Sequence, residues 1–246
     1  MKLFDAHCHL QGDRILPDLE NTVARAAGAG VERMVCAGTS PADWNRVAEC
    51  ARRYPQQIIP MFGIHPWFAD GATDIELLKK FLLENPSAGV GETGLDFQEH
   101  FTNRDAQEKS FAEHLKLAGE LNRPVAVHCV RAWGRLIEIL KETPAPKILL
   151  HAYSGAPELI PELVSLNCWF SFNAGVENPS AKKMRAAVVA VPENRLLIET
   201  DSTEPANLIS VFRVVAELRK NAGSDEILFR NAQNFFTVNS ISIRVH

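Results

Sequence analysis

Short apolar runs alternate with longer amphipathic stretches along the chain of 246 residues. The apolar runs have the length of buried strands, and the amphipathic stretches carry apolar residues at helical spacing. The predicted strands lie at Lys2–Ala6, Arg33–Ala37, Ile58–Phe62, Gly89–Glu92, Pro124–His128, Lys147–Leu150, Cys168–Phe172 and Leu196–Glu199. The predicted helices that follow them lie at Asp18–Ala29, Pro41–Tyr54, Asp74–Glu84, Asp105–Asn122, Trp133–Lys141, Pro157–Leu166, Ser180–Val191 and Asn207–Asn221. A last helical stretch is predicted at Ser224–Val238.

This regular alternation predicts an α/β protein whose parallel strands are joined by helical crossovers. Eight strand–helix units favour a closed (β/α)8 barrel of the TIM type, and an open doubly wound sheet is the competing arrangement. A length of 246 residues is ordinary for one such barrel. Because no linker rich in Pro, Gly or Ser interrupts the pattern, we expect one domain spanning residues 1–246.

The composition adds limits on function. Hydrophobic residues make up 46% of the chain and charged residues 23%, as in a globular protein with a substantial core. The formal net charge is −4, whereas a protein that coats nucleic acid through its general surface is usually basic. If the substrate is a phosphate polymer, positive charge must be supplied locally, and metal ions are one source.

The cysteines and the first residues bear on location. None of the five cysteines forms a Cys-x-x-Cys pair, which disfavours a zinc ribbon or a thioredoxin-type site. Free thiols in this number indicate a reducing compartment. Asp5 and His7 interrupt the apolar stretch that a signal peptide needs, and no uncharged run approaches the ~18 residues of a membrane span. We therefore expect a cytoplasmic protein with no membrane contact.

Candidate metal ligands gather where the predicted strands end. Six ligand-type residues fall at the ends of five strands, and His65 follows a further strand. In a barrel all these ends surround one opening, where active sites of this architecture lie. The six predicted metal ligands are His7, His9, Glu92, His128, His151 and Asp201.

The spacing of these residues supports a metal site without sulfur. His7 and His9 are two residues apart, so both rings point to one side of an extended strand and Cys8 points to the other. Imidazole with carboxylate suits Zn, Mn or Mg-like ions and does not select among them. Two ions about 3.5–4 Å apart need a bridging anion, and the two oxygens of Glu92 make it the natural candidate.

Other interpretations of single residues stay open. Asp5 either accepts a hydrogen bond from a ligand imidazole or bonds locally in a turn. Glu92 alone is compatible with half of a salt bridge, and Asp201 alone with a helix N-cap. An aromatic at Trp67 or Phe68 either stacks on a base or packs internally, and packing is favoured.

Taken together as an ordered set, these motifs resemble the TatD family of metal-dependent deoxyribonucleases, within the amidohydrolase-like barrels. The matching segments run over nearly the whole chain: Phe4–Leu10, Gly63–Pro66, Gly91–Phe97, Arg123–His128, His151–Gly155 and Glu199–Ser202. The resemblance implies one metal held by His7, His9, Glu92 and Asp201, and a second held by Glu92, His128 and His151. It also implies that Asp201 is the general base and that His65 binds substrate phosphate.

These features predict a hydrolase with two divalent ions that cleaves phosphodiester bonds at DNA ends, with no obligate protein partner. The alternatives are a small-molecule amidohydrolase or esterase that uses the same site, and a metal-binding scaffold without catalysis. Family members usually carry a proline directly after the Glu-Thr-Asp-Ser segment, whereas Thr203-Glu204-Pro205 stands here. The departure bears on the substrate mouth, because that loop helps to shape it.

Overall fold

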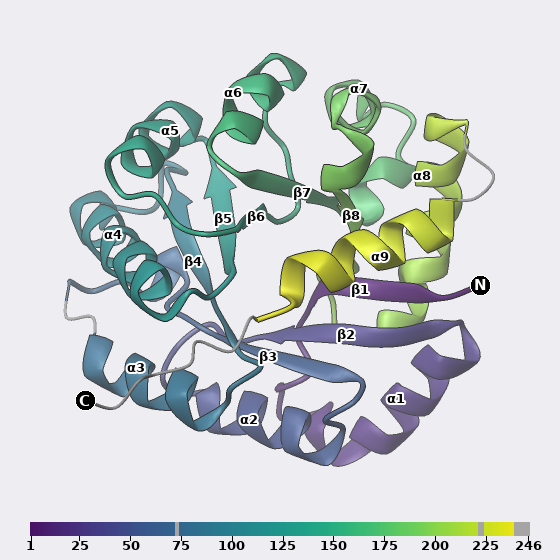
Figure 1. Cartoon of the computed structure of the whole chain (residues 1–246), viewed down its shortest axis with the longest axis horizontal. Helices are drawn as coiled ribbons and strands as arrows, with labels where there is room; N and C mark the ends of the chain where they lie inside the picture. The colour runs from purple at the N-terminus through teal and green to yellow at the C-terminus, as the bar shows by residue number, and fades with distance from the viewer. Residues whose placement is uncertain (72–73, 221–223, 239–246) are drawn as a thin grey trace.

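Eight parallel strands form the centre of the molecule, and each pairs with the next in chain order (Figure 1). The structure is a computed structural model that describes residues 1–71, 74–220 and 224–238. The strands are β1 Leu3–Cys8, β2 Val31–Ala37, β3 Ile58–Phe62, β4 Gly89–Asp96, β5 Val125–Val130, β6 Ile148–Leu150, β7 Cys168–Phe172 and β8 Leu196–Ile198. The predicted (β/α)8 barrel is confirmed.

Helices surround the strands, as expected for parallel strands with helical crossovers. They are α1 Leu19–Gly28, α2 Trp44–Arg53, α3 Ile75–Glu84, α4 Arg104–Leu121, α5 Trp133–Glu142, α6 Ile160–Ser165, α7 Lys182–Ala190, α8 Leu208–Arg219 and α9 Ser224–Phe236. The prediction was wrong at the end of β4, which runs to Asp96 rather than Glu92. It failed there because Gly91, Thr93 and Gly94 look like a turn, yet all are buried in the strand. The predicted helix end at Asn221 lies outside the described residues.

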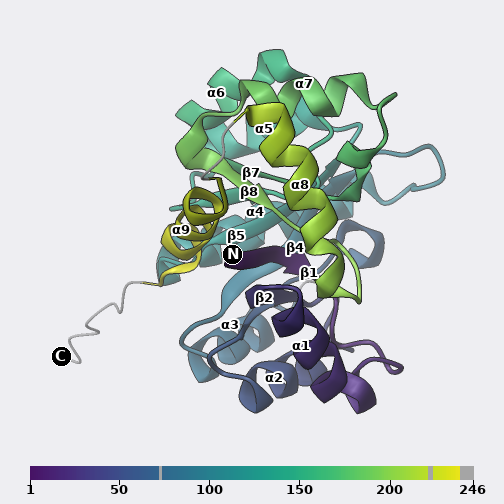
Figure 2. The ribbon, with the colours of Figure 1, turned by 90° about the vertical axis from the view of Figure 1, so that its right-hand side faces the viewer.

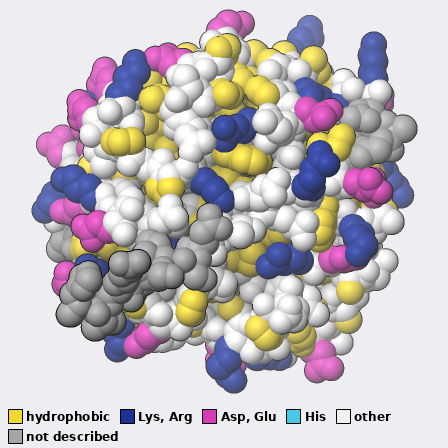
Figure 3. Space-filling model, viewed as in Figure 1, with side chains coloured by type: hydrophobic (Ala, Val, Ile, Leu, Met, Phe, Trp, Pro, Cys, Tyr) yellow, Lys and Arg dark blue, Asp and Glu magenta, His cyan; other side chains and the backbone are white. Residues whose placement is uncertain are grey.

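One end of the barrel is closed by apolar packing. Phe235 and Phe236 of α9 are almost fully buried and pack with Phe4 of β1 at the beginnings of the strands. Burying one phenylalanine side chain stabilises the folded state by about 1.5–3 kcal/mol, so the packing of α9 against this end of the barrel contributes substantially to stability. Figure 2 shows α9 at one end of the strands, with the β1 arrow pointing away from it. On the described surface of that end, Figure 3 shows no histidine.

The five cysteines belong to the packing and not to the open end. All are buried and unpaired among the described residues. Cys8 lies in the core cluster between the barrel and its helices, and its thiol donates to the carbonyl of Val35 at 3.1 Å. This agrees with the expectation that Cys8 points away from its histidine neighbours. Within the described residues, no helix is both long enough and apolar enough for a membrane span.

The seam between β8 and β1 is held by a side chain as well as by backbone. The backbone N–H of Asp201 donates to the His7 carbonyl at 2.9 Å. Oδ1 of Asp5 accepts from the backbone N–H of Thr200 at 2.9 Å and from that of His7 at 3.3 Å, and its Oδ2 is hydrogen-bonded to Thr200 Oγ1 at 2.5 Å. Of the two alternatives for Asp5, local turn bonding is therefore the one observed. The structure adds bonds across the seam.

We expect Asp5→Ala to lower the free energy of unfolding by about 3 kcal/mol, because it leaves two buried N–H groups without an acceptor. Burial raises the pKa of Asp5 to about 8, and Asp5→Asn keeps a side-chain oxygen that can accept from the same two N–H groups. The Asn variant should lose less than about 1 kcal/mol. Urea unfolding in the presence of a chelator measures both. Equal losses in the two variants would contradict the seam role.

Candidate metal centre

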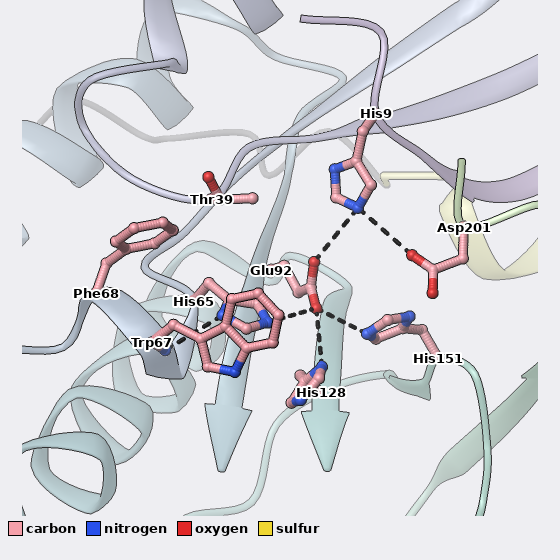
Figure 4. Close-up of a pocket in the computed structure, with 9 residues that line it drawn as sticks. All are labelled: His9, Thr39, His65, Trp67, Phe68, Glu92, His128, His151 and Asp201. Atoms are coloured by element: carbon pink, nitrogen blue, oxygen red, sulfur yellow. Dashed lines mark hydrogen bonds and ion pairs between the residues drawn. The ribbon is translucent and has the colours of Figure 1, made fainter. Parts of the chain in front are cut away.

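The open end of the barrel holds a pocket of about 320 Å³. Its lining comes from the carboxyl ends of strands that are far apart in the chain, and polar side chains from these ends converge on one carboxylate (Figure 4). The lining residues are His9, Thr39, His65, Trp67, Phe68, Glu92, His128, His151 and Asp201. The six predicted ligands and His65 are thus brought together at this end, with His7 buried beneath the pocket floor.

Glu92 lies at the centre and is only 2% exposed. Its Oε2 is 3.2 Å from His7 Nε2 and 3.8 Å from His9 Nε2. Its Oε1 faces a second group of imidazoles, at 3.2 Å from His65 Nε2, 3.1 Å from His128 Nδ1 and 2.8 Å from His151 Nε2. The two carboxylate oxygens therefore face different sets of histidines.

The electrostatics follow from this arrangement. Burial alone would raise the pKa of Glu92, but His151 and His7 outweigh it and hold that pKa well below the usual value. Burial alone would lower the pKa of His151, yet Glu92 and Glu199 raise it well above the usual value. The pKa of His128 is also raised, against burial, by Asp96 and Glu92. Without metal, the site consequently holds an ionised carboxylate beside two imidazoles, His151 and His128, whose protonated forms are favoured.

In His9, His151 and His128, the ring nitrogen that does not serve as the pocket-facing atom has a partner that sets the tautomer of the neutral ring. Nδ1 of His9 lies 3.0 Å from the Ala37 carbonyl, which can only accept, so Nδ1 carries the proton and Nε2 has the lone pair. Nδ1 of His151 faces Glu199 Oε1 at 3.3 Å with the same consequence. Both rings therefore present Nε2 to the pocket as a potential ligand atom.

His128 is held the other way round. Its Nε2 faces Asp96 Oδ2 at 3.3 Å, which leaves the Nδ1 lone pair directed at Glu92. Asp96 is fully buried, and the same oxygen accepts from Trp67 Nε1 at 2.7 Å. One carboxylate therefore orients both a candidate metal ligand and an aromatic side chain of the pocket wall.

His65 differs in polarity from these three rings. Its Nδ1 accepts a hydrogen bond from the backbone N–H of Trp67 at 3.2 Å. In the neutral ring the proton must therefore be on Nε2, which faces Glu92 as a donor. Burial lowers the pKa of His65, which favours this neutral form. A donor at this position suits an anion rather than a metal ion.

Asp201 follows β8 and faces the first histidine pair. Its Oδ1 is 3.5 Å from His9 Nε2, and its Oδ2 accepts from Asn173 Nδ2 at 3.4 Å. Burial would raise its pKa, but His9 lowers it to about 2, so the carboxylate is ionised at neutral pH. The N-cap alternative is wrong, because the N-cap residue of α8 is Asn207.

The residues fit a divalent ion on their own chemistry. Imidazole and carboxylate atoms lie in overlapping groups of three within 4.8 Å of one another. Nδ1 of His7 and Nε2 of His151 are buried without a hydrogen-bond partner. Nε2 of His151 is 2.8 Å from Glu92 Oε1, but the alignment is wrong for a hydrogen bond. A buried nitrogen without a hydrogen-bond partner, such as His151 Nε2 with its lone pair turned to the pocket, is what a metal site offers.

The sequence analysis missed the supporting partner Glu199 and left Asp96 unassigned. Glu199 is fully buried and accepts from the Ala152 backbone N–H at 2.7 Å and from Ser171 Oγ, besides facing His151. An acid at the end of the apolar run Leu196–Ile198 was the available signal. His114 of α4 accepts a hydrogen bond from the Ile64 N–H at 3.1 Å and so supports the loop that carries His65.

The segment Thr203-Glu204-Pro205 turns away from the pocket. Glu204 accepts from Arg25 of α1 at 2.8 and 3.0 Å, and none of the three residues is among those that line the pocket. The segment that departs from the family pattern therefore does not contribute to the described pocket wall.

Comparison with known proteins identifies the family. A family model described as TatD related DNase matches residues 4–237, which is almost the whole chain. The chain belongs to the TatD family. The resemblance seen in the sequence motifs is thereby confirmed.

Individual TatD relatives match over most of their length. The uncharacterized metal-dependent hydrolase YabD of Bacillus subtilis is 31% identical over 255 residues, covering 96% of this chain and 100% of YabD. The 3'-5' ssDNA/RNA exonuclease TatD of Edwardsiella piscicida is 30% identical over 209 residues, covering 81% of this chain and 79% of that protein. The crystal structure of YjjV, a TatD homolog from Escherichia coli, matches with a TM-score of 0.89 at 29% identity, over 96% of this chain and 98% of YjjV. The protein is a TatD-family metal-dependent hydrolase.

The raised pKa values of His151, His128 and His9 predict how metal binding depends on pH. Protons held by these rings must leave before the lone pairs can bind a metal. The affinity of metal-stripped protein for Mn²⁺ should therefore rise with pH through and above 6.5, the ordinary histidine pKa, about tenfold per pH unit for each proton displaced. Calorimetric titrations in buffers of different ionisation enthalpy count these protons. His151→Ala should release fewer, and a pH-independent affinity would refute the expectation.

Proposed function

We propose that this protein is a nuclease that hydrolyses phosphodiester bonds at the ends of DNA, and that residues 1–246 work as one barrel domain. The observation that carries the proposal is the pocket itself, where a buried carboxylate and ligand-oriented imidazoles adjoin a hydrogen-bond donor suited to an anion. The proposed reaction uses a metal-activated water, so no protein nucleophile is required. DNA would be a transient partner.

The two carboxylate oxygens of Glu92 face different histidines, and this arrangement supports two divalent ions. Oε2 faces His7 and His9, and His9 adjoins Asp201. Oε1 faces His128 and His151. We assign the first set to one ion and the second set to the other, with Glu92 shared. When bound, Mg²⁺, Mn²⁺ or Zn²⁺ would supply Lewis-acid activation of water and of the substrate phosphate.

Asp201 is the candidate general base. Its carboxylate is ionised at neutral pH, partly exposed to the pocket, and held by His9 and Asn173. These contacts leave it able to orient a water molecule in the pocket and to accept a proton from it. The backbone of Asp201 is in the left-handed region, with φ of 50°, and is fixed by its bond to the His7 carbonyl. That fixed backbone limits the directions in which the carboxylate can point.

His65 is the candidate phosphate-binding residue. Its Nε2–H points toward the pocket centre, because the Trp67 backbone N–H occupies the other nitrogen. Such a donor can bind a phosphate oxygen beside the ions without competing for them. The lowered pKa keeps the ring neutral, so its contribution is a hydrogen bond rather than a charge.

A hydrolysis panel tests the proposed function. Metal-stripped protein is re-supplied with Mg²⁺, Mn²⁺ or Zn²⁺ and assayed on single-stranded DNA, duplex DNA, RNA and a carboxylic ester. We expect cleavage from DNA ends, and Asp201→Asn should lower kcat by about 10²–10⁴-fold, the usual range for a general base. The melting temperature of the same preparation controls for folding. Hydrolysis of the ester with no cleavage of any nucleic acid would favour the small-molecule alternative.

The bridging role of Glu92 predicts different metal contents for two variants. Glu92→Ala should lose both ions, whereas His7→Ala should mainly lose one, because only Glu92 is shared between the two sets. Elemental analysis of the dialysed variants gives the metal content per chain, and circular dichroism confirms that each is folded. Full occupancy in Glu92→Ala would rule out the bridge.

A further inference from the structure

Two large apolar side chains are exposed at the rim of the pocket. Trp67 is 51% exposed and Phe68 is 54% exposed, whereas the other Phe, Tyr and Trp side chains of the described chain are buried or partly buried. Both belong to a short 3-10 helix, Pro66–Phe68, directly after His65. In Figure 4 they lie on one side of the pocket, with Asp201 and His9 on the other. The packing role favoured from sequence accounts for only part of their surface.

The Trp67 indole is held in a fixed orientation. One face stacks on Phe101, with ring centroids 5.6 Å apart and an angle of 21°. Its Nε1–H donates to Asp96 Oδ2 at 2.7 Å. Asn103 Nδ2 donates to the carbonyls of Pro66 and Ala69 at 3.0 and 2.7 Å, which clamps the 3-10 helix at both ends. The exposed half of the indole is therefore a rigid flat surface beside the pocket.

This surface adjoins the groups proposed to bind phosphate. The Trp67 ring lies 4.7 Å from the His65 ring, centroid to centroid. Asp96 Oδ2, which holds the indole, also faces His128 Nε2 at 3.3 Å. A flat group attached to a phosphate that reaches His65 would consequently lie against the indole.

We propose that Trp67, with Phe68 extending the same wall, is a stacking platform for an unpaired nucleobase next to the scissile phosphate. The proposal rests on the proposed nuclease function and assigns to Trp67 and Phe68 the contact with the base beside the cleaved bond. An aromatic surface accepts every base, since each has a flat face, so recognition is tolerant of sequence. A base inside a duplex has both faces covered by its neighbours and cannot stack there.

The size and charge of the site support this occupant. A cavity of about 320 Å³ is near the lower end of the range for ligand pockets, so it admits one nucleotide unit and not a duplex. A formal net charge of −4 also disfavours broad electrostatic binding of the phosphate backbone. Affinity must then come from the pocket, through the ions and through the stacked base.

A matched pair of oligonucleotides tests the platform. One is a single-stranded DNA, and the other is identical except that its terminal nucleotides are abasic. In the wild-type enzyme loaded with Mn²⁺, we expect kcat/KM to be about 5- to 150-fold higher for the end that carries bases, the range given by stacking on an aromatic side chain. Trp67→Leu should bring this ratio close to one.

Two further variants separate stacking from the bond to Asp96. Trp67→Phe keeps an aromatic face but lacks the indole N–H, so it should retain most of the preference for base-bearing ends. Leu83→Ala removes another exposed apolar side chain, 49% exposed on α3 and not among the residues that line the pocket, and should keep the full ratio. Metal content is measured for every variant.

The outcomes test the stacking platform separately from the nuclease function on which it depends. Equal cleavage of both oligonucleotides by the wild type would overturn the platform alone. So would a Trp67→Phe variant as impaired as Trp67→Leu, because the role would then be to hold Asp96. If the metal-loaded wild type cleaves neither oligonucleotide, the proposed nuclease function is wrong, and the proposed platform is wrong as well because it depends on that function.

Discussion

The open end of the barrel is organised around one buried carboxylate. Glu92 is 2% exposed, and an ionised group at such a depth costs several kcal/mol unless opposite charges and hydrogen bonds compensate. The compensation comes from imidazoles on other strands, at 2.8 to 3.2 Å for His7, His128 and His151. These distances are met only if the strand ends are in register around the whole barrel. The site can therefore assemble only when the barrel closes. For this reason the hydrogen bonds of Asp5 at the seam between β1 and β8 matter for the fold and for the site.

The imidazoles of His9, His128 and His151 could serve as metal ligands because contacts with other parts of the fold fix the tautomers of their neutral rings. A carbonyl on β2, a buried acid at the end of β4 and another after β8 hold the outer nitrogens of His9, His128 and His151. Each partner sits on a different element, so the lone pairs that face the pocket are fixed by the barrel and not by local sequence. Fixed orientation reduces the entropy lost when a ligand binds, and it raises the basicity of the ring.

Much of the molecule was predictable because it depends on periodic patterns. The strand order, the helical crossovers and the gathering of ligand-type residues follow from alternating apolar runs and from the shared direction of parallel strands. The end of β4 could not be predicted, because glycines favour a turn, whereas the glycines of this segment are buried within the strand. The partners of Asp5 and Glu199 were also beyond sequence alone, because Thr200 and Ser171 come near them only after the chain has folded. The role of such a side chain can be assigned only when its neighbours in the folded structure are known.

The contrast between His65 and His128 shows how far such neighbours decide chemistry. The two rings lie side by side, with centroids 4.5 Å apart, and both face Oε1 of Glu92. A backbone N–H occupies one nitrogen of His65, so the neutral ring donates toward the pocket. A carboxylate occupies one nitrogen of His128, so the neutral ring offers a lone pair. Two adjacent histidines thereby acquire opposite polarities in their neutral forms, one suited to an anion and one to a cation.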